Sequence, residues 1–182
     1  MKHPQKLAVE LDEQSLTYAE LLYYVQVLSL HLINKYYVVP GEVICQCVER
    51  SLSMVIGILS IAMVGSAYCP LSVRDPPQRL QVLVNQTQSR LVLVHASTPA
   101  IFSPDNLTLN IDCIIRLEER FSEINLNELS DVPVTTESVA FVIFTSGSTG
   151  IPKAVYTITV SFDVLANAFF LKIGSTASSK LH

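Results

Sequence analysis

The sequence predicts an α/β fold, a mostly parallel β-sheet with helices on both faces. Continuous apolar runs such as Ser138–Phe144 and Leu91–Val94 are typical of strands that are buried on both faces. These runs alternate with segments whose apolar residues recur at helical spacing. A strand at 42–48, a helix that begins after Ser51 and a return to the sheet also form a βαβ unit. Together these three observations favour one parallel sheet.

Length and composition favour a single folded domain and exclude several classes of function. The chain has 182 residues, 49% of them apolar and 15% charged, which is unlike a disordered acidic or basic tail. The net charge of −4 gives no reason to expect nucleic acid or an anionic membrane as a ligand. The N-terminus lacks the apolar core of a signal peptide, and Met54–Gly65 is too short to span a bilayer. A cytoplasmic location is therefore expected.

Four cysteines, Cys45, Cys47, Cys69 and Cys113, allow two disulfides or one metal site in principle. None has the C-x-x-C spacing of zinc or redox motifs. We expect buried free thiols and no metal site, with Cys45 and Cys47 on one face of a strand.

The N-terminal third reads as two short strands and a helix. Lys6–Leu11 alternates like a half-buried strand, and Asp12–Ser15 is a turn into a second one. Thr17 with Glu20 forms a capping-box pattern, which predicts a helix down to about Lys35.

The middle third continues the alternation of helices and strands. The helix capped by Ser51 is expected to run through Val64 and to stop at Gly65. Residues 65–71 read as a tight loop, in which Tyr68 and Pro70 pack rather than bind substrate. A helix over 78–88 should then point three residues inward: Leu80, Leu83 and Val84.

The region before the last strand is less regular. His95 is expected to be a strand-end residue rather than a catalyst, and 98–110 reads as a loop. Asp112–Ile115 is expected to form a short strand. Residues 118–137 are interpreted as an acidic connector, and we assign their carboxylates no acid–base role.

A candidate phosphate-binding loop follows the predicted strand at 138–144. Glycines let the backbone approach a ligand closely, and successive N–H groups with nearby hydroxyls can surround an anion. A lysine three residues after the second glycine adds a full positive charge. The residues expected to bind a polyphosphate are Thr145, Ser146, Gly147, Ser148, Thr149, Gly150 and Lys153.

The competing interpretation is a solvated connector, since Ser, Thr and Gly clusters usually join elements. A buried strand, two glycines, four hydroxyls, a proline and a lysine in one order favour the phosphate loop. The loop is not a Walker A motif, because Lys153 does not directly follow Gly150, and G-x-G-x-x-G is absent.

Three segments resemble one known family. Thr145–Lys153 looks like the signature loop of adenylate-forming enzymes, the superfamily of nonribosomal peptide synthetase adenylation domains, acyl-CoA synthetases and luciferases. Leu16–Leu21 and Gly65–Leu71 resemble two earlier segments of adenylation domains, in the same order. The resemblance implies the N-terminal subdomain fold of such an enzyme.

The resemblance also implies chemistry. In the family, a carboxylate attacks the α-phosphorus of ATP while the loop grips the β- and γ-phosphates. It implies ATP and Mg²⁺ as cofactors and an amino acid as the activated carboxylate. A phosphopantetheine carrier or CoA would be the acyl acceptor, and a fatty or aryl acyl-CoA synthetase is the second choice.

The quoted segments end near Val155. We therefore expect residues 1–155 to be a partial adenylation domain and 156–182 to be a divergent, poorly ordered tail. The later family segments are not found, so the chain alone is expected to be inactive, a truncated or alternatively spliced product that at most binds pyrophosphate weakly or pairs with a complementary fragment. Such a piece would expose apolar surface and self-associate.

Overall fold

The computed structural model describes residues 3–98, 102, 106–116, 129, 132–133, 138–145 and 152–158. The elements are β1 (Leu7–Leu11), β2 (Gln14–Thr17), α1 (Tyr18–Tyr36), β3 (Val43–Cys47), α2 (Leu52–Met63), β4 (Ala67–Pro70), α3 (Pro77–Thr87), β5 (Leu91–Val94), β6 (Leu107–Asn110), α4 (Ile111–Arg116), β7 (Val139–Thr145) and β8 (Lys153–Ile158).

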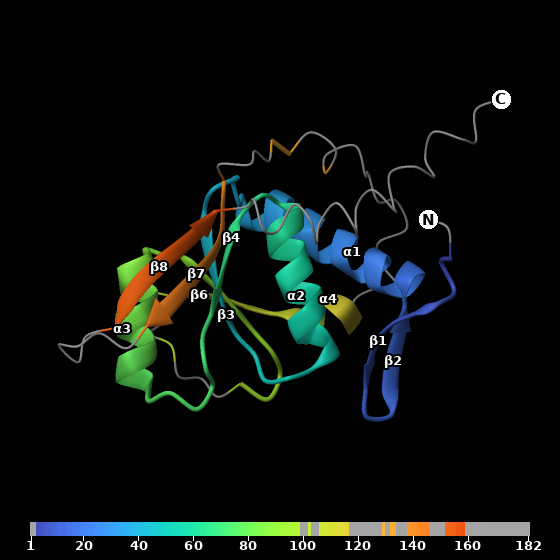
Figure 1. The fold of residues 1–182 in the computed structure, drawn as a ribbon, viewed down its shortest axis with the longest axis horizontal. Coiled ribbons are helices and arrows are strands. Elements are labelled where there is room, and N and C mark those ends of the chain that lie inside the picture. Colours follow the sequence, from blue (N-terminus) through green and yellow to red (C-terminus); the bar gives the residue numbers. More distant parts are fainter. Residues whose placement is uncertain are drawn as a thin grey trace.

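Six strands form one mixed sheet in the order β6-β5-β3-β4-β7-β8. The first five strands in that order pair in parallel, and β8 pairs antiparallel with β7. Figure 1 shows α1, α2 and α4 on one side of this sheet and α3 on the other, while β1 and β2 form a separate hairpin. The predicted fold class, a mostly parallel sheet with helices on both faces, is confirmed.

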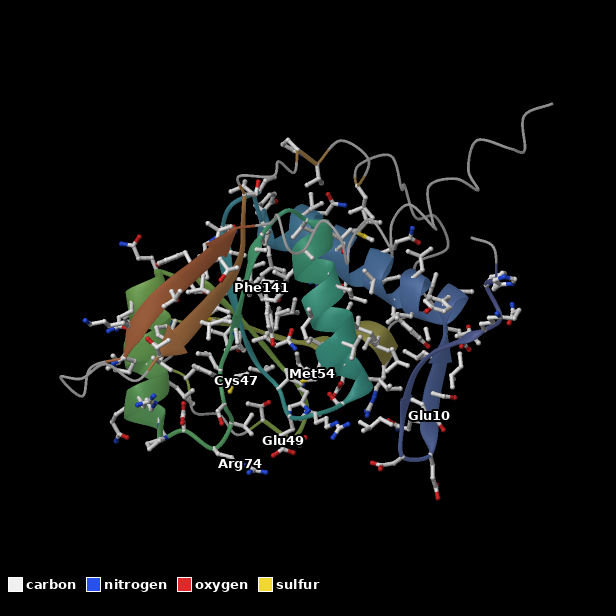
Figure 2. All side chains as sticks on the ribbon, in the orientation of Figure 1. Glu10, Cys47, Glu49, Met54, Arg74 and Phe141 are labelled. Atoms are coloured by element: carbon white, nitrogen blue, oxygen red, sulfur yellow. The ribbon has the colours of Figure 1, made fainter. Side chains whose placement is uncertain are left out.

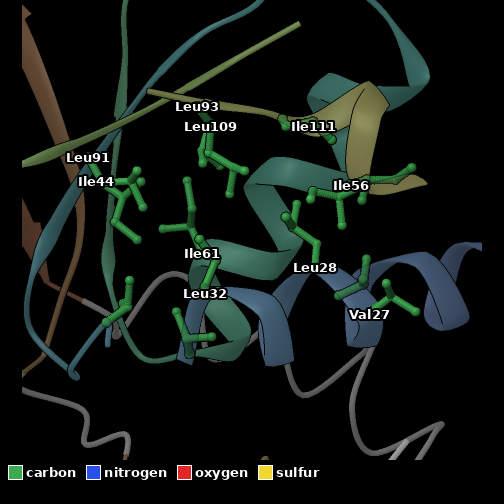
Figure 3. Packing of buried hydrophobic residues seen from close by; sticks show 14 of the residues in the cluster. Val27, Leu28, Leu32, Ile44, Ile56, Ile61, Leu91, Leu93, Leu109 and Ile111 are labelled. Carbon is green, nitrogen blue, oxygen red and sulfur yellow. The ribbon is translucent and has the colours of Figure 1, made fainter. Parts of the chain in front are cut away.

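The two faces of the sheet carry separate apolar cores. One core packs α1, α2 and α4 against strand residues such as Ile44 and Leu93, as the close view in Figure 3 shows. The other packs α3 against Cys45, Cys47 and Cys69, all three with no exposed surface. Cys45 and Cys47 therefore share one face, as predicted, because side chains alternate along a strand.

The helix boundaries follow local capping. The Thr17 side chain accepts from the Glu20 amide, and Glu20 accepts from the Thr17 amide, which confirms the predicted capping box. Ser51 caps α2 by accepting from the Met54 amide at 3.1 Å. Gly65 follows α2 with φ +70°, a backbone angle that favours glycine.

The predicted strand over Asp112–Ile115 is wrong, because these residues belong to the helix α4. The Asn110 side-chain oxygen accepts from the amides of Asp112 at 3.0 Å and Cys113 at 3.4 Å, so it caps the start of that turn. The predicted loop at 98–110 is wrong at its end, where Leu107–Asn110 forms β6. Cys113 is exposed on α4, which corrects its prediction as a buried thiol.

Two further expectations need correction. The predicted tight loop over Gly65–Leu71 contains β4, which lies between β3 and β7 in the middle of the sheet. The strand β7 is not covered on both faces in the described structure: Val142 is buried, while the next residue, Ile143, is 48% exposed. Both corrections concern tertiary neighbours, which a short apolar run cannot specify.

Candidate functional site

The strand β7 carries the predicted phosphate loop to the carboxyl edge of the sheet. Its polypeptide direction is parallel to that of β4, and Thr145 is its last residue. Ligands of open α/β sheets bind in crevices outside the carboxyl ends of the parallel strands. The chain that follows Thr145 therefore starts at the edge where such sheets bind ligands.

Two of the predicted site residues face each other at the base of the loop. Thr145 and Lys153 are register partners in the antiparallel β7–β8 pair, and the Thr145 hydroxyl donates to the Lys153 carbonyl oxygen at 3.4 Å. The Lys153 side chain is exposed. The remaining predicted residues lie outside the described part of the chain: Ser146, Gly147, Ser148, Thr149 and Gly150.

The strand β8 was not expected from the sequence. Its residues Val155–Ile158 are β-branched or aromatic, and this composition was the available signal. The pairing makes the loop the connection of a β-hairpin, with both ends fixed by β7 and β8. The strand also continues to Ile158, three residues past the predicted boundary at Val155, and that boundary stays a prediction.

Lys153 makes no ion pair with another residue in the described part of the chain. Within the described residues the ion pairs join Arg79 to Asp75 and Arg90 to Glu42, and neither involves Lys153. An exposed ammonium on a strand next to a hydroxyl- and glycine-rich connection can donate three hydrogen bonds to phosphate oxygens.

A second polar cluster lies at the carboxyl ends of β3 and β5. His95 follows β5, is 7% exposed, and accepts at Nε2 from the Glu49 amide at 3.4 Å. The Asp112 carboxylate accepts from the Ser53 hydroxyl at 2.6 Å and from the Ala96 amide at 2.9 Å. Burial, the largest single cause, raises the pKa of Asp112, but these hydrogen bonds together with the charges of His95 and Arg116 outweigh it, and the pKa is lowered.

This cluster links backbone segments rather than presenting a reactive group. Figure 2 shows Glu49 near Cys47, at the carboxyl end of β3. The His95 ring supports that turn through the Glu49 amide, so it occupies the predicted role of a strand-end residue.

Two of the buried thiols, Cys47 and Cys69, are poorly suited to nucleophilic chemistry. Burial raises the pKa of the Cys47 thiol to about 11, which leaves it protonated at neutral pH. A hydrogen bond to Cys45, with burial, raises the pKa of Cys69 as well. Across the described residues, no group of three or more Cys, His, Asp or Glu side chains is arranged to hold a metal ion.

Similarity to known proteins decides the family. The AMP-binding enzyme family matches residues 1–179. This chain belongs to the AMP-binding enzyme family.

Curated relatives in this family are much longer than the chain. One component of the linear gramicidin synthase of Brevibacillus parabrevis is 38% identical over 152 residues, which are 83% of this chain and 3% of the relative. Malpinin synthetase of Mortierella alpina is 39% identical over 153 residues, 84% of this chain and 2% of the relative. The chain thus spans a few hundredths of the length of these curated relatives.

Two solved structures share the fold of this chain. The crystal structure of VinN superposes with a TM-score of 0.73 at 26% identity, over 95% of this chain and 46% of VinN. The N-terminal subdomain of Klebsiella oxytoca NpsA gives a TM-score of 0.72 at 20% identity, over 85% of this chain and 38% of that one. The described residues correspond in fold to the N-terminal subdomain of an adenylate-forming enzyme. They include no helix long and apolar enough to cross a membrane.

Proposed function

We propose that this chain supplies the phosphate-binding part of an ATP-dependent carboxylate-activating enzyme. The observation that supports it most directly is the β7–β8 hairpin, which brings Thr145 and Lys153 together at the carboxyl edge of a parallel sheet. The connection between them carries the hydroxyls of Ser146, Ser148 and Thr149 and the glycines at 147 and 150.

Each residue has a role in the proposed site. The amides at Gly147 and Gly150 and the neighbouring hydroxyls bind the β- and γ-phosphate oxygens of ATP. Lys153 pairs with the γ-phosphate. A substrate carboxylate attacks the α-phosphorus, the bond to the β-phosphate bridging oxygen breaks, and pyrophosphate leaves with that electron pair. Stabilising the negative charge of the leaving pyrophosphate is the contribution of this chain.

The proposed substrate is an amino acid, and the proposed acyl acceptor is a phosphopantetheine carrier. The support is that curated relatives are nonribosomal peptide synthetases and that one structural neighbour is an artificially fused adenylation–PCP di-domain. Mg²⁺ is proposed as the ion that accompanies ATP, and no residue of this chain is assigned to it. A fatty or aryl acyl-CoA synthetase, with CoA as acceptor, is the alternative.

The test combines binding and turnover in the purified chain. Isothermal titration with ATP and with inorganic tripolyphosphate should show binding that Lys153→Ala weakens by about tenfold, which corresponds to one lost charge-assisted contact of about 1.4 kcal/mol. Lys35→Ala, at the last turn of α1, is the matched control and should leave the affinity unchanged. Failure of the wild-type chain to bind either ligand overturns the proposal.

Amino-acid-dependent ATP–pyrophosphate exchange then separates an enzyme from a binding segment. Exchange that disappears in Lys153→Ala supports catalysis by the chain itself. Binding without exchange supports the phosphate-binding role alone. Exchange that needs a fatty acid in place of an amino acid, with acyl-CoA and AMP formed when CoA is added, supports the acyl-CoA synthetase alternative.

Self-association is proposed through the exposed apolar side chains of the hairpin. Ile143 is 48% exposed, Val155 is 46% exposed and Tyr156 is 52% exposed. Light scattering after size exclusion should show dimers or larger species that Val155→Asp reduces, whereas Val39→Asp, at a residue 59% exposed elsewhere, leaves them. A monomer at all concentrations contradicts this proposal. The cytoplasmic location stays a prediction.

A further inference from the structure

The hairpin that carries the phosphate loop joins the rest of the sheet through β4. In the described strands, the register between β4 and β7 consists of one pair of residues, Tyr68 and Phe141. By comparison, β3 and β4 pair over four residues and β5 and β6 over four. The Tyr68–Phe141 pair is therefore the point at which the registers of the hairpin and the body of the sheet are joined.

The side chains of that pair also meet. The rings of Tyr68 and Phe141 are T-shaped, with centroids 5.9 Å apart and planes at 87°. This is one of the favoured geometries for aromatic pairs, because the edge of one ring faces the electron-rich face of the other. Figure 2 shows Phe141 toward the interior of the molecule, where β7 approaches β4.

Tyr68 is itself held firmly. Its strand pairs with β3, where Ile44 is its register partner, and burial raises the pKa of its hydroxyl to about 12. On the opposite face of the same two strands, Cys69 and Val142 are fully buried in the core beneath α3. The ring pair therefore fixes the hairpin on one face, and apolar packing fixes it on the other.

A displacement of β7 at the Tyr68–Phe141 contact would also shift the start of the phosphate loop. Phe141 lies four residues before Thr145, about 13 Å along an extended strand. A strand transmits a shift or tilt at Phe141 to its end, and phosphate-binding groups lose their effect when they are misplaced by about 1 Å.

We propose that Tyr68 is a positioning residue for the phosphate loop, acting through Phe141 on β7. This inference rests on the proposed function, because it concerns where the loop that binds ATP phosphates is held. The predicted packing role of Tyr68 thereby becomes a functional one without any contact to the ligand.

Three variants test the role of the ring. Tyr68→Leu removes the aromatic edge-to-face contact, Tyr68→Phe keeps it, and Tyr23→Leu is the matched control. Tyr23 belongs to an aromatic pair with Tyr24 at the same centroid separation, 5.9 Å, but on α1. Each variant is titrated with inorganic tripolyphosphate at a temperature well below its own unfolding midpoint.

We expect Tyr68→Leu to weaken tripolyphosphate binding by about tenfold, Tyr68→Phe to stay within about twofold, and Tyr23→Leu to bind like the wild-type chain. Hydrogen exchange should become faster in β7 and β8 of Tyr68→Leu and stay unchanged in β3 and β5. Unchanged binding by folded Tyr68→Leu overturns the proposal, and so does weakening by Tyr23→Leu to the same degree.

Two further outcomes are distinguished. If Tyr68→Leu does not fold, Phe141→Leu replaces it, since the same contact is removed from the hairpin side, with the same expected and contradicting results. If the wild-type chain binds no tripolyphosphate, the proposed function fails and the positioning role falls with it. In that case, hydrogen exchange in β7 and β8 of Tyr68→Leu still shows whether the ring pair fixes the hairpin.

Discussion

The body of the sheet and the β7–β8 hairpin at its edge are held in different ways. The body comprises β3, β4, β5 and β6, with helices packed on both faces and side chains such as Ile61 fully buried. In the hairpin, Ile143 and its register partner Val155 are each about half exposed. The candidate phosphate loop thus sits on the less covered of the two regions, and functional loops are commonly drawn from regions of low local stability.

The comparison teaches that stability and binding are separable in this chain. Changes in the body away from Tyr68 should lower the free energy of unfolding with little direct effect on the loop. Changes at the hairpin should alter phosphate binding at little cost in stability. Four measurements test this difference between the body of the sheet and the hairpin.

The largest expected difference comes from one substitution made in both regions. Ile61→Ala, at a residue with no exposed surface, should lower the free energy of unfolding by about 3–4 kcal/mol through lost burial and a cavity. Ile143→Ala, at a residue 48% exposed, should cost about 1 kcal/mol or less. Urea denaturation followed by circular dichroism measures both. Equal losses would show that the hairpin is covered as fully as the body.

A close contact inside the body gives the next effect. A Cβ on Gly57 would overlap the Gln46 side-chain oxygen and lie 2.9 Å from Ile111 Cδ1. The Gln46 amide is 2% exposed and donates to the Met54 carbonyl oxygen, so it cannot move away freely. Gly57→Ala should cost about 1–3 kcal/mol.

The matched test is the double variant Gly57→Ala with Gln46→Ala, which removes the overlapping amide. The loss in the double variant should be smaller than the sum of the two single losses. Strict additivity in urea denaturation would contradict the overlap. Tripolyphosphate affinity should be unchanged in every folded variant of this set.

A smaller effect on the free energy of unfolding is expected at Arg90, which links the end of α1 to Glu42. Its guanidinium donates to the carbonyl oxygens of Tyr36 and Tyr37 at 2.7 and 3.0 Å and pairs with Glu42. Because these carbonyls end α1, Arg90→Met should lower stability by about 1 kcal/mol. Arg79→Met, which breaks only an exposed pair with Asp75, is the control and should cost less than about 0.5 kcal/mol. Thermal denaturation measures both variants. Equal decreases in melting temperature for Arg90→Met and Arg79→Met would contradict the role of Arg90.

The smallest effect is a pH dependence that belongs to the body. Burial, and then the charge of Lys35, lower the pKa of His31 below 6.5 in the folded chain. The unfolded state therefore binds the proton more readily, so the stability from neutral His31 is present above pH 6.5 and is lost as pH falls toward the folded pKa. Denaturation at pH 7.5 and 5.5 should show this decrease, and His31→Gln should flatten it. If His31→Gln loses as much stability between pH 7.5 and 5.5 as the wild-type chain does, groups other than His31 cause the pH dependence.

Local signals in the sequence were sufficient for the elements whose limits depend on nearby residues. The capping box of Thr17 and Glu20 located the start of α1, and Ser51 located the start of α2. The inward residues of α3 were also predicted correctly, since Leu80, Leu83 and Val84 are all buried. These features follow from hydrogen bonds and periodicity within one or two turns.

Elements whose identity depends on distant neighbours were predicted wrongly or not at all. Residues 67–70 were interpreted as part of a tight loop that follows the helix ending at Gly65, yet pairing with β3 and β7 makes them β4. Asp112–Ile115 is apolar enough for a strand, but Ile111 and Ile114 pack as one face of the helix α4 into the core that α1 and α2 form. Packing partners outweigh local preference in such short segments.

For the candidate site, the residue types can be read from the sequence: hydroxyls and glycines lie between Thr145 and Lys153, in an order that resembles the signature loop of the family. The three-dimensional fold was needed to find that these two residues are partners in a hairpin, and that Tyr68, over seventy positions earlier in the chain, contacts the first strand of that hairpin. The physical reason is that a motif records which groups can bind a phosphate. Strand pairing and side-chain packing between distant segments then place those groups in space.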